Sequence, residues 1–282
     1  MKNKMTVAGR GWVALLTTAV AVNAAMAVRA DTVTMGYSRV DPNAVVGIHS
    51  ATPSENVNVY AGAYRHNLLT PPPSYFDVLQ DGRSSVPLFC ADVRQNVEPA
   101  GGAVYTVRPT WEGPRPTEPG GNDGYPMGIV RAEWLSVLAY DYWTTSYLEN
   151  GEGASISNST VAERYAALQV AIWEMIFEGN PASDIPADWN VSNTSTIGEN
   201  DFYINNGRVA DEANGMLNAV QAHGLDSGHA FLAILTNDTY QDMLVRTTVD
   251  APWLINQVPE PTALLLAGFG LMGLLNRRNR RA

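Results

Sequence analysis

Short runs of alternating apolar and polar residues follow position 30, and this pattern predicts β-strands. The clearest run, residues 56–64, has a period of two, as expected for a strand with one buried face. The Asp81–Gly82 pair marks a turn between two later runs. The strands predicted in this β-rich portion, residues 31–108, are 33–37, 56–64, 75–79, 86–93 and 103–107.

The apolar period changes to that of helices after a Pro- and Gly-rich segment, residues 109–127, which predicts a long surface loop. Thr160 and Glu163 have the spacing of a capping box, so a helix should begin there. Gly179, Asn180 and Pro181 should end it. The predicted helices are 129–148, 160–178 and 206–223, and two closing strands are predicted at 231–235 and 243–249.

Strands and helices are therefore segregated along the chain, which is typical of the α+β class. We expect a β-rich N-terminal portion, a sheet or sandwich, to pack against a small helical bundle formed by residues 128–224. A closing β segment at 229–250 should complete it. Residues 31–257 are expected to form one domain or a tightly joined pair.

The N-terminal 30 residues have the features of a secretory signal peptide. Lys2, Lys4 and Arg10 precede a short apolar run at 12–22, and small residues at Ala27 and Ala30 offer two cleavage sites. We favour cleavage after Ala30. The apolar run is well short of the ~20 residues of a spanning helix, which favours a cleaved signal over a retained anchor.

The C-terminal segment, residues 258–282, contains a box, an apolar run and a basic cluster in that order. Val258, Pro259, Glu260 and Pro261 precede an apolar run at 262–275, and four arginines follow within residues 277–281. The arginines should stay on the cytoplasmic side. The run is marginal for a permanent span, which favours a transient inner-membrane anchor, with a plain single-pass anchor as the alternative.

This tail resembles the PEP-CTERM sorting signal. The resemblance implies export across the inner membrane of a Gram-negative, exopolysaccharide-producing bacterium and processing near the box by an exosortase. The protein would then reach the cell surface or the extracellular matrix.

The charge of the segment between the two ends excludes one class of partner. It contains ten arginines, no lysine and 27 acidic residues, a formal charge of −17. Nucleic-acid binding is therefore not expected, because it needs a basic face. The four histidines lack metal-ligand spacing, and no metal or cofactor is predicted.

Cys90 is the only cysteine, so an intramolecular disulfide is excluded. It lies in an aromatic-Cys-apolar triplet with Phe89, on a predicted strand. Gln169 lies on the apolar face of a predicted helix, four residues before Trp173. Taken alone, each also suits a structural role: a small buried side chain for Cys90, a stripe-edge amide for Gln169.

Together these residues resemble the bacterial Cys–Gln thioester domain. The resemblance implies an internal thioester between Cys90 and Gln169, shielded from water by Phe89 and Trp173. It also implies covalent attachment to an amine-bearing partner, a single event rather than enzymatic turnover. A domain without lysine offers no side-chain amine that its own thioester could react with. Compositional drift toward arginine is the alternative explanation for the absence of lysine.

Three histidines, His66, His223 and His229, are candidates by chemistry for the base that activates the amine, although each also suits a surface position. The sequence has no stalk repeats and no Gram-positive wall-sorting motif, so biofilm or exopolysaccharide attachment is favoured over host adhesion. The alternatives are a non-covalent structural matrix protein and, less favoured, a hydrolase with Cys90 as nucleophile.

Overall fold

The computed structural model describes residues 31–50, 55–77, 85–92, 96–98, 101–113, 127–177, 189–192, 202–225 and 228–248. The predicted signal peptide, most of the predicted 109–127 loop, the Pro-Glu-Pro box and the apolar tail lie outside these residues. The described residues all belong to one compact unit, which begins at Asp31.

Seven strands form one antiparallel sheet that closes on itself. The order is β2-β3-β7-β6-β4-β1, and β1 also pairs with β2, so six strands make a barrel and β5 extends the far end of β1. Closure removes the exposed edges that an open sheet would present. The strands are β1 (Thr32–Ser50), β2 (Glu55–Leu68), β3 (Ser85–Cys90), β4 (Ala103–Pro109), β5 (Phe202–Ile204), β6 (Phe231–Thr236) and β7 (Met243–Thr247).

The length and bending of β1 make this closure feasible. Residues 32–35 pair with β4, while residues from Met35 to Ser50 pair with β2. The β1–β2 register shifts twice, between Tyr37 and Arg39 and again before Asn43, and such bulges bend and twist a strand. Gly62 lies at the bend with a φ of 151°, and a Cβ there would lie 2.2 Å from the carbonyl oxygen of Pro42.

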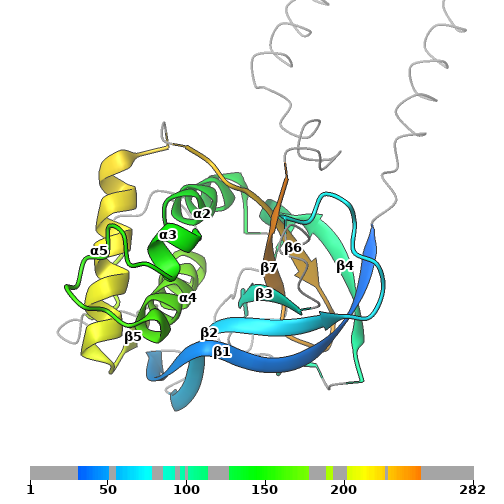
Figure 1. Ribbon diagram of the computed structural model, residues 1–282, viewed down its shortest axis with the longest axis horizontal. Helices are drawn as coiled ribbons and strands as arrows, with labels where there is room; N and C mark the ends of the chain where they lie inside the picture. Colours follow the sequence, from blue (N-terminus) through cyan, green and yellow to red (C-terminus); the bar gives the residue numbers. More distant parts are fainter. Residues whose placement is uncertain are drawn as a thin grey trace, which may run out of the picture. The chain divides into compact units, whose positions relative to one another are not determined.

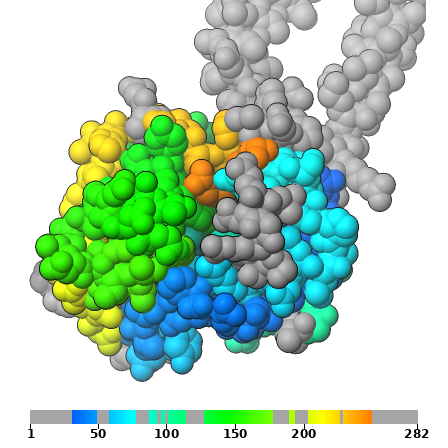
Figure 2. Space-filling view, viewed as in Figure 1, coloured from blue at the N-terminus to red at the C-terminus, as the bar shows by residue number. Residues whose placement is uncertain are grey.

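The helices gather on one side of the barrel (Figure 1). α4 contacts the other α-helices and also β1, β2 and β3, so it joins the two halves of the domain. The helical part and the β1–β2 hairpin adjoin directly on the face shown in Figure 2. The helices are η2 (Thr110–Glu112), α2 (Ile129–Tyr142), α3 (Thr145–Leu148), α4 (Val161–Phe177) and α5 (Gly207–His223).

The predicted capping box is confirmed at the start of α4. The Thr160 N–H donates to Glu163 Oε2 at 2.7 Å, and the Glu163 N–H donates to Thr160 Oγ1 at 3.2 Å. The Arg208 side chain of α5 bonds the same carboxylate and, with the capping bonds, lowers the pKa of Glu163 to about 2. One carboxylate therefore both caps α4 and ties it to α5.

The α+β class and the β-rich N-terminal portion are confirmed, while several predicted bounds need correction. The strand predicted at 33–37 continues to Ser50 through its bulges, and β5 was missed. In the strand predicted at 75–79, Phe76 makes only an isolated bridge to Thr247. The helix predicted at 129–148 breaks after Tyr142 because Trp143 leaves the helical conformation and its ring packs on Phe89, 4.6 Å away between centroids.

Replacing Thr160 by Ala should lower the free energy of unfolding by about 1 kcal/mol, because the Glu163 N–H loses its capping acceptor. Urea denaturation followed by circular dichroism measures this. Thr160→Ser keeps the hydroxyl and serves as the matched control, which should unfold like the unsubstituted protein. Equal midpoints for the Ala and Ser variants would show that the capping bond does not stabilise α4.

Candidate functional site

The structure brings Cys90 and Gln169 together. Cys90 ends β3 and Gln169 lies in the middle of α4, and both side chains are completely buried. The Cys90 N–H donates to Gln169 Oε1 at 2.8 Å, and Gln169 Nε2 donates to the Cys90 carbonyl oxygen at 2.8 Å. The primary amide thus makes the pair of hydrogen bonds that a neighbouring strand would make.

The strand has an open position for this amide because its neighbour β2 ends its pairing early. The Ala91 N–H donates to the Asp242 carbonyl oxygen at 2.8 Å, on the side where β7 lies. Backbone groups of successive residues point to opposite sides, so those of Cys90 face the β2 side. The last β2–β3 pair is Tyr64 with Leu88, two residues before Cys90, and Gln169 fills the position beyond it.

The Cys90 thiol is held in its neutral form. Its Sγ donates to the Asp92 carbonyl oxygen at 3.0 Å. Burial raises the pKa of Cys90 well above its ordinary value, and the charges of Asp92 and Asp242 raise it further. The Trp173 side chain and the Asp92 backbone act in the opposite direction but are outweighed. The thiol is therefore not a preformed thiolate nucleophile.

Aromatic residues flank Cys90 and Gln169 along the chain, on β3 and on α4. Phe89 and Trp173, both predicted to lie here, are completely buried. The Phe89 ring meets Trp143 edge-on at 4.6 Å and stacks on Tyr165 at 6.2 Å, between centroids. Sequence reasoning missed Trp143 and Tyr165 as neighbours of the site, although Tyr165 precedes Gln169 by one helical turn, a spacing that signals a shared helix face.

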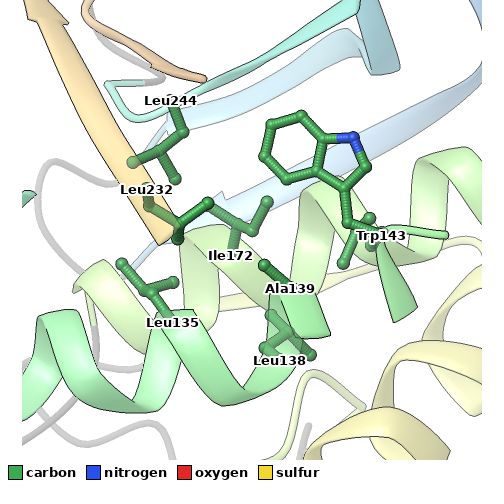
Figure 3. A pocket seen from close by; sticks show the side chains of 8 residues that line it. Leu135, Leu138, Ala139, Trp143, Ile172, Leu232 and Leu244 are labelled. Carbon is green, nitrogen blue, oxygen red and sulfur yellow. The ribbon is translucent and has the colours of Figure 1, made fainter. Parts of the chain in front are cut away.

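A dry apolar layer extends from these rings between the helices and the barrel. Figure 3 shows side chains of α2, α4, β6 and β7 converging with Trp143 on one narrow gap, which is too small to admit water. Leu168, the neighbour of Gln169, is part of this lining. Water is thus excluded from the layer beside Leu168. The lining residues are Leu135, Leu138, Ala139, Trp143, Leu168, Ile172, Leu232 and Leu244.

Two side chains at the β6–β7 turn also border the site, Gln241 and Asp242. Asp242 is 5% exposed, and its Oδ1 accepts the Asn237 N–H at 2.8 Å. Burial raises the pKa of Asp242 to about 7, and the charges of Asp92 and Asp238 contribute. Sequence reasoning missed Asp242 because only the pairing of β7 with β3 brings it near Cys90.

The hydrogen bonds of the three candidate histidines lead elsewhere. His66 is buried in the barrel rather than at the surface, and its Nε2 lies 3.0 Å from Glu98 Oε1. His223 pairs with Asp141 at 3.0 Å, and His229 bonds the Leu225 carbonyl oxygen at 2.9 Å. A general base among them stays a prediction. Within the described ranges, no group of three or more His, Cys, Asp or Glu side chains is arranged to hold a metal ion.

Comparison with known proteins informs the C-terminal segment. Residues 257–281 match the family model of the PEP-CTERM protein-sorting motif. The chain carries a PEP-CTERM sorting motif. The match includes the predicted box from Val258 to Pro261, and a PEP-CTERM motif supports an exported protein that is sorted by an exosortase.

No curated protein and no solved structure matches the chain. In the part of the chain that the structure describes, no helix is long and apolar enough to cross a bilayer. The predicted anchor at 262–275 lies outside that part and stays a prediction.

The two hydrogen bonds between the Gln169 amide and the Cys90 backbone should contribute measurably to the free energy of unfolding. In a Cys90→Ala background, where no cross-link can form, Gln169→Leu should lower the free energy of unfolding by about 1–3 kcal/mol, because the buried N–H and C=O of residue 90 lose their partners. Chemical denaturation measures the difference. Gln221→Leu, a half-buried glutamine of α5, is the matched control and should have a much smaller effect. Equal effects at the two positions would contradict the pairing.

Proposed function

We propose that this exported protein holds a thioester between Cys90 and Gln169 and uses it once to attach covalently to an amine-bearing partner. The observation that carries the proposal is the pair of 2.8 Å hydrogen bonds between the Gln169 amide and the Cys90 backbone. These bonds hold the amide of one residue against the residue that bears the thiol.

Formation of the bond is an acyl transfer within the chain. The Cys90 sulfur attacks the Gln169 amide carbon, the C–N bond breaks, and the thiol proton leaves with the nitrogen as ammonia. Negative charge develops on Gln169 Oε1, which already accepts the Cys90 N–H, so this donor stabilises the intermediate. The bond from Nε2 to the Cys90 carbonyl oxygen fixes the orientation of the leaving nitrogen.

Once formed, a thioester survives only if water is kept away. The buried rings of Phe89 and Trp173, the Trp143 and Tyr165 rings around Phe89, and the dry layer beside Leu168 provide that exclusion. Because the site is buried, the neutral thiol and the ester replace one another without creating a charge in an apolar environment.

Reaction with a partner consumes the bond. The partner's amine attacks the Gln169 acyl carbon, a C–N bond forms, the C–S bond breaks, and Cys90 is released as a thiol with the proton from the amine. The product is an isopeptide-type amide, and each molecule reacts once without turnover. The sorting motif suggests the setting, the cell surface or the biofilm and exopolysaccharide matrix.

The contacts favour this function over its alternatives. A Cys90 hydrolase of the Cys–His type needs a histidine base near the sulfur, but the bonds of His66, His223 and His229 lead to other residues. In a non-covalent matrix protein the Cys90–Gln169 pairing would have no chemical role. The mass experiment below distinguishes this alternative from the thioester.

The intact mass of the purified protein tests the bond. The protein should be lighter than its sequence mass by one ammonia, and methylamine treatment should add one methylamine and expose one thiol to alkylation. Cys90→Ala and Gln169→Ala should both have the full sequence mass and take up no methylamine. A full mass with an alkylated Cys90 in the folded, untreated protein would contradict the thioester and favour the non-covalent alternative.

The lysine-free domain offers a further test of how the bond is used. Arg39→Lys places an exposed primary amine on β1, at a side chain that is 64% exposed, and should produce covalent dimers in concentrated protein. Denaturing electrophoresis and mass spectrometry measure the dimer fraction, with Arg39→Gln as the matched control. The same dimer fraction in both variants would show that the absence of lysine has no protective effect.

A further inference from the structure

The proposed function leaves open how a buried thioester receives an amine that is protonated at neutral pH. Asp92 lies two residues after Cys90, just beyond the end of β3, and is half-buried, whereas Cys90 and Ala91 are fully buried. Asp92 is thus the first residue after Cys90 that reaches solvent. Its carbonyl oxygen accepts the thiol hydrogen bond at 3.0 Å, which places its backbone against the sulfur.

A second carboxylate approaches from the opposite strand. Asp242 directly precedes β7, and its carbonyl oxygen accepts the Ala91 N–H, one residue beyond Cys90. The side chain is 5% exposed and bonds the Asn237 N–H, so it is fixed in position. Asp92 and Asp242 both raise the pKa of the Cys90 thiol, and Asp92 also raises the pKa of Asp242.

Gln241 supplies an independent sign that this region takes a donor. Its side chain, 5% exposed, hydrogen-bonds Tyr64, and Cys90 is one of the groups that raise the pKa of the Tyr64 hydroxyl. Gln241 Oε1 is nevertheless buried with no hydrogen-bond partner among the residues described. A buried acceptor without a donor is costly, and an N–H group of a bound ligand would satisfy it.

We propose that Asp92, Asp242 and Gln241 bind the partner's amine as a primary alkylammonium and that Asp242 accepts its proton before attack on the thioester. This inference rests on the proposed function and deepens it by naming the class of target. An ammonium has three donors and one positive charge, which matches two carboxylates and one unpaired carbonyl. The partner is therefore a lysine side chain or a polyamine rather than a hydroxyl-bearing sugar.

The proton is conserved through the reaction. The ammonium gives a proton to the Asp242 carboxylate, and the free amine attacks the Gln169 acyl carbon. The C–S bond breaks, the second amine proton and the Asp242 proton are released as the amide forms, and one of them protonates the Cys90 sulfur. Asp242 returns to its ionised form, and the net products are the amide, the thiol and one proton.

The neighbouring charges and the burial of Asp242 set the pKa at which it can accept the proton. Asp92 and Asp238 raise its pKa, Arg108 of β4 lowers it, and Asp242 in turn raises the pKa values of Cys90 and Tyr105. Burial is the largest cause and brings the pKa of Asp242 to about 7. Above that pH the carboxylate is ionised and attracts an ammonium, and below it the carboxyl is neutral and does neither task.

The test uses the full chain and two probes, methylamine, which is a cation at neutral pH, and hydroxylamine, which is uncharged there. Rates of mass change are normalised to the thioester-containing fraction. In Asp242→Asn the methylamine rate should fall about 100-fold, the low end of general-base effects, while the hydroxylamine rate changes little. Asp238→Asn, an exposed acid of the same turn, removes an equal charge. Because Asp238 raises the pKa of Asp242, the variants are compared at a pH well above 7, where the Asp242 carboxylate is ionised with or without Asp238 and both rates should be unchanged.

A pH series adds a readout that a purely structural role would not change. The ratio of methylamine to hydroxylamine rates should rise through a pH of about 7 in the unsubstituted protein and lose that inflection in Asp242→Asn. Asn can still accept the Asn237 N–H. The native protein binds the Asp242 proton more tightly than the unfolded chain, so this group's stabilisation falls as pH rises toward 7, and Asp242→Asn should melt no lower than the unsubstituted protein above that pH.

The outcomes separate the two levels of the proposal. If the protein has its full sequence mass, the thioester and this inference both fail. If the thioester forms but Asp242→Asn reacts with methylamine at the unsubstituted rate, or loses both probes equally, only the inference fails. An equal loss in Asp238→Asn would attribute the effect to overall charge. Gln241→Leu, which should also slow methylamine selectively, gives a second measurement if Asp242→Asn does not fold.

Discussion

The domain depends on one hydrogen-bonded junction, the Gln169 amide seated on the open edge of β3 at Cys90. A barrel strand needs partners for its backbone groups. The pairing of β3 with β2 ends at the Leu88–Tyr64 pair, two residues before Cys90. The helix α4 supplies them instead with a side chain. The rest of the domain is organised around bringing α4 to that position, from the capping box at Thr160 to the α5 contact through Arg208.

The same junction explains why the helical half and the barrel form a single core. α4 is apolar on nearly all sides, which is the composition of a helix buried all round rather than one with a solvent face. A polar amide inside such a helix is costly unless it is fully paired. Gln169 is therefore an unusual residue whose position is explained by Cys90, and under the proposed function the same two bonds also orient the reacting atoms.

The sequence predicted those features that depend on local patterns. The α+β class, the start of α4 and the pairing of helix and strand at Gln169 and Cys90 follow from periodicity, capping spacing and a recognised motif. Barrel closure could not be predicted, because it depends on β1 passing through two bulges between two partners. Trp143 and Asp242 were missed for a related reason, since a helix break and a distant strand pairing bring them to the site.

Under the proposed function, protection and reactivity make opposite demands on the stored acyl group, and the arrangement of charge around Cys90 would reconcile them. The aromatic and apolar side chains lie around Phe89 and along α4, where they exclude water, while the carboxylates of Asp92 and Asp242 lie at the other end of the short segment that contains the thiol. Carboxylates there oppose ionisation of the thiol, which keeps the sulfur neutral, yet they attract a cation. Water carries no charge and gains little from this field, whereas an ammonium gains both attraction and a proton acceptor. Under that proposal, the acidic, lysine-free composition of residues 31–257 extends the same bias, since a negative charge attracts cations and the segment offers no side-chain amine of its own.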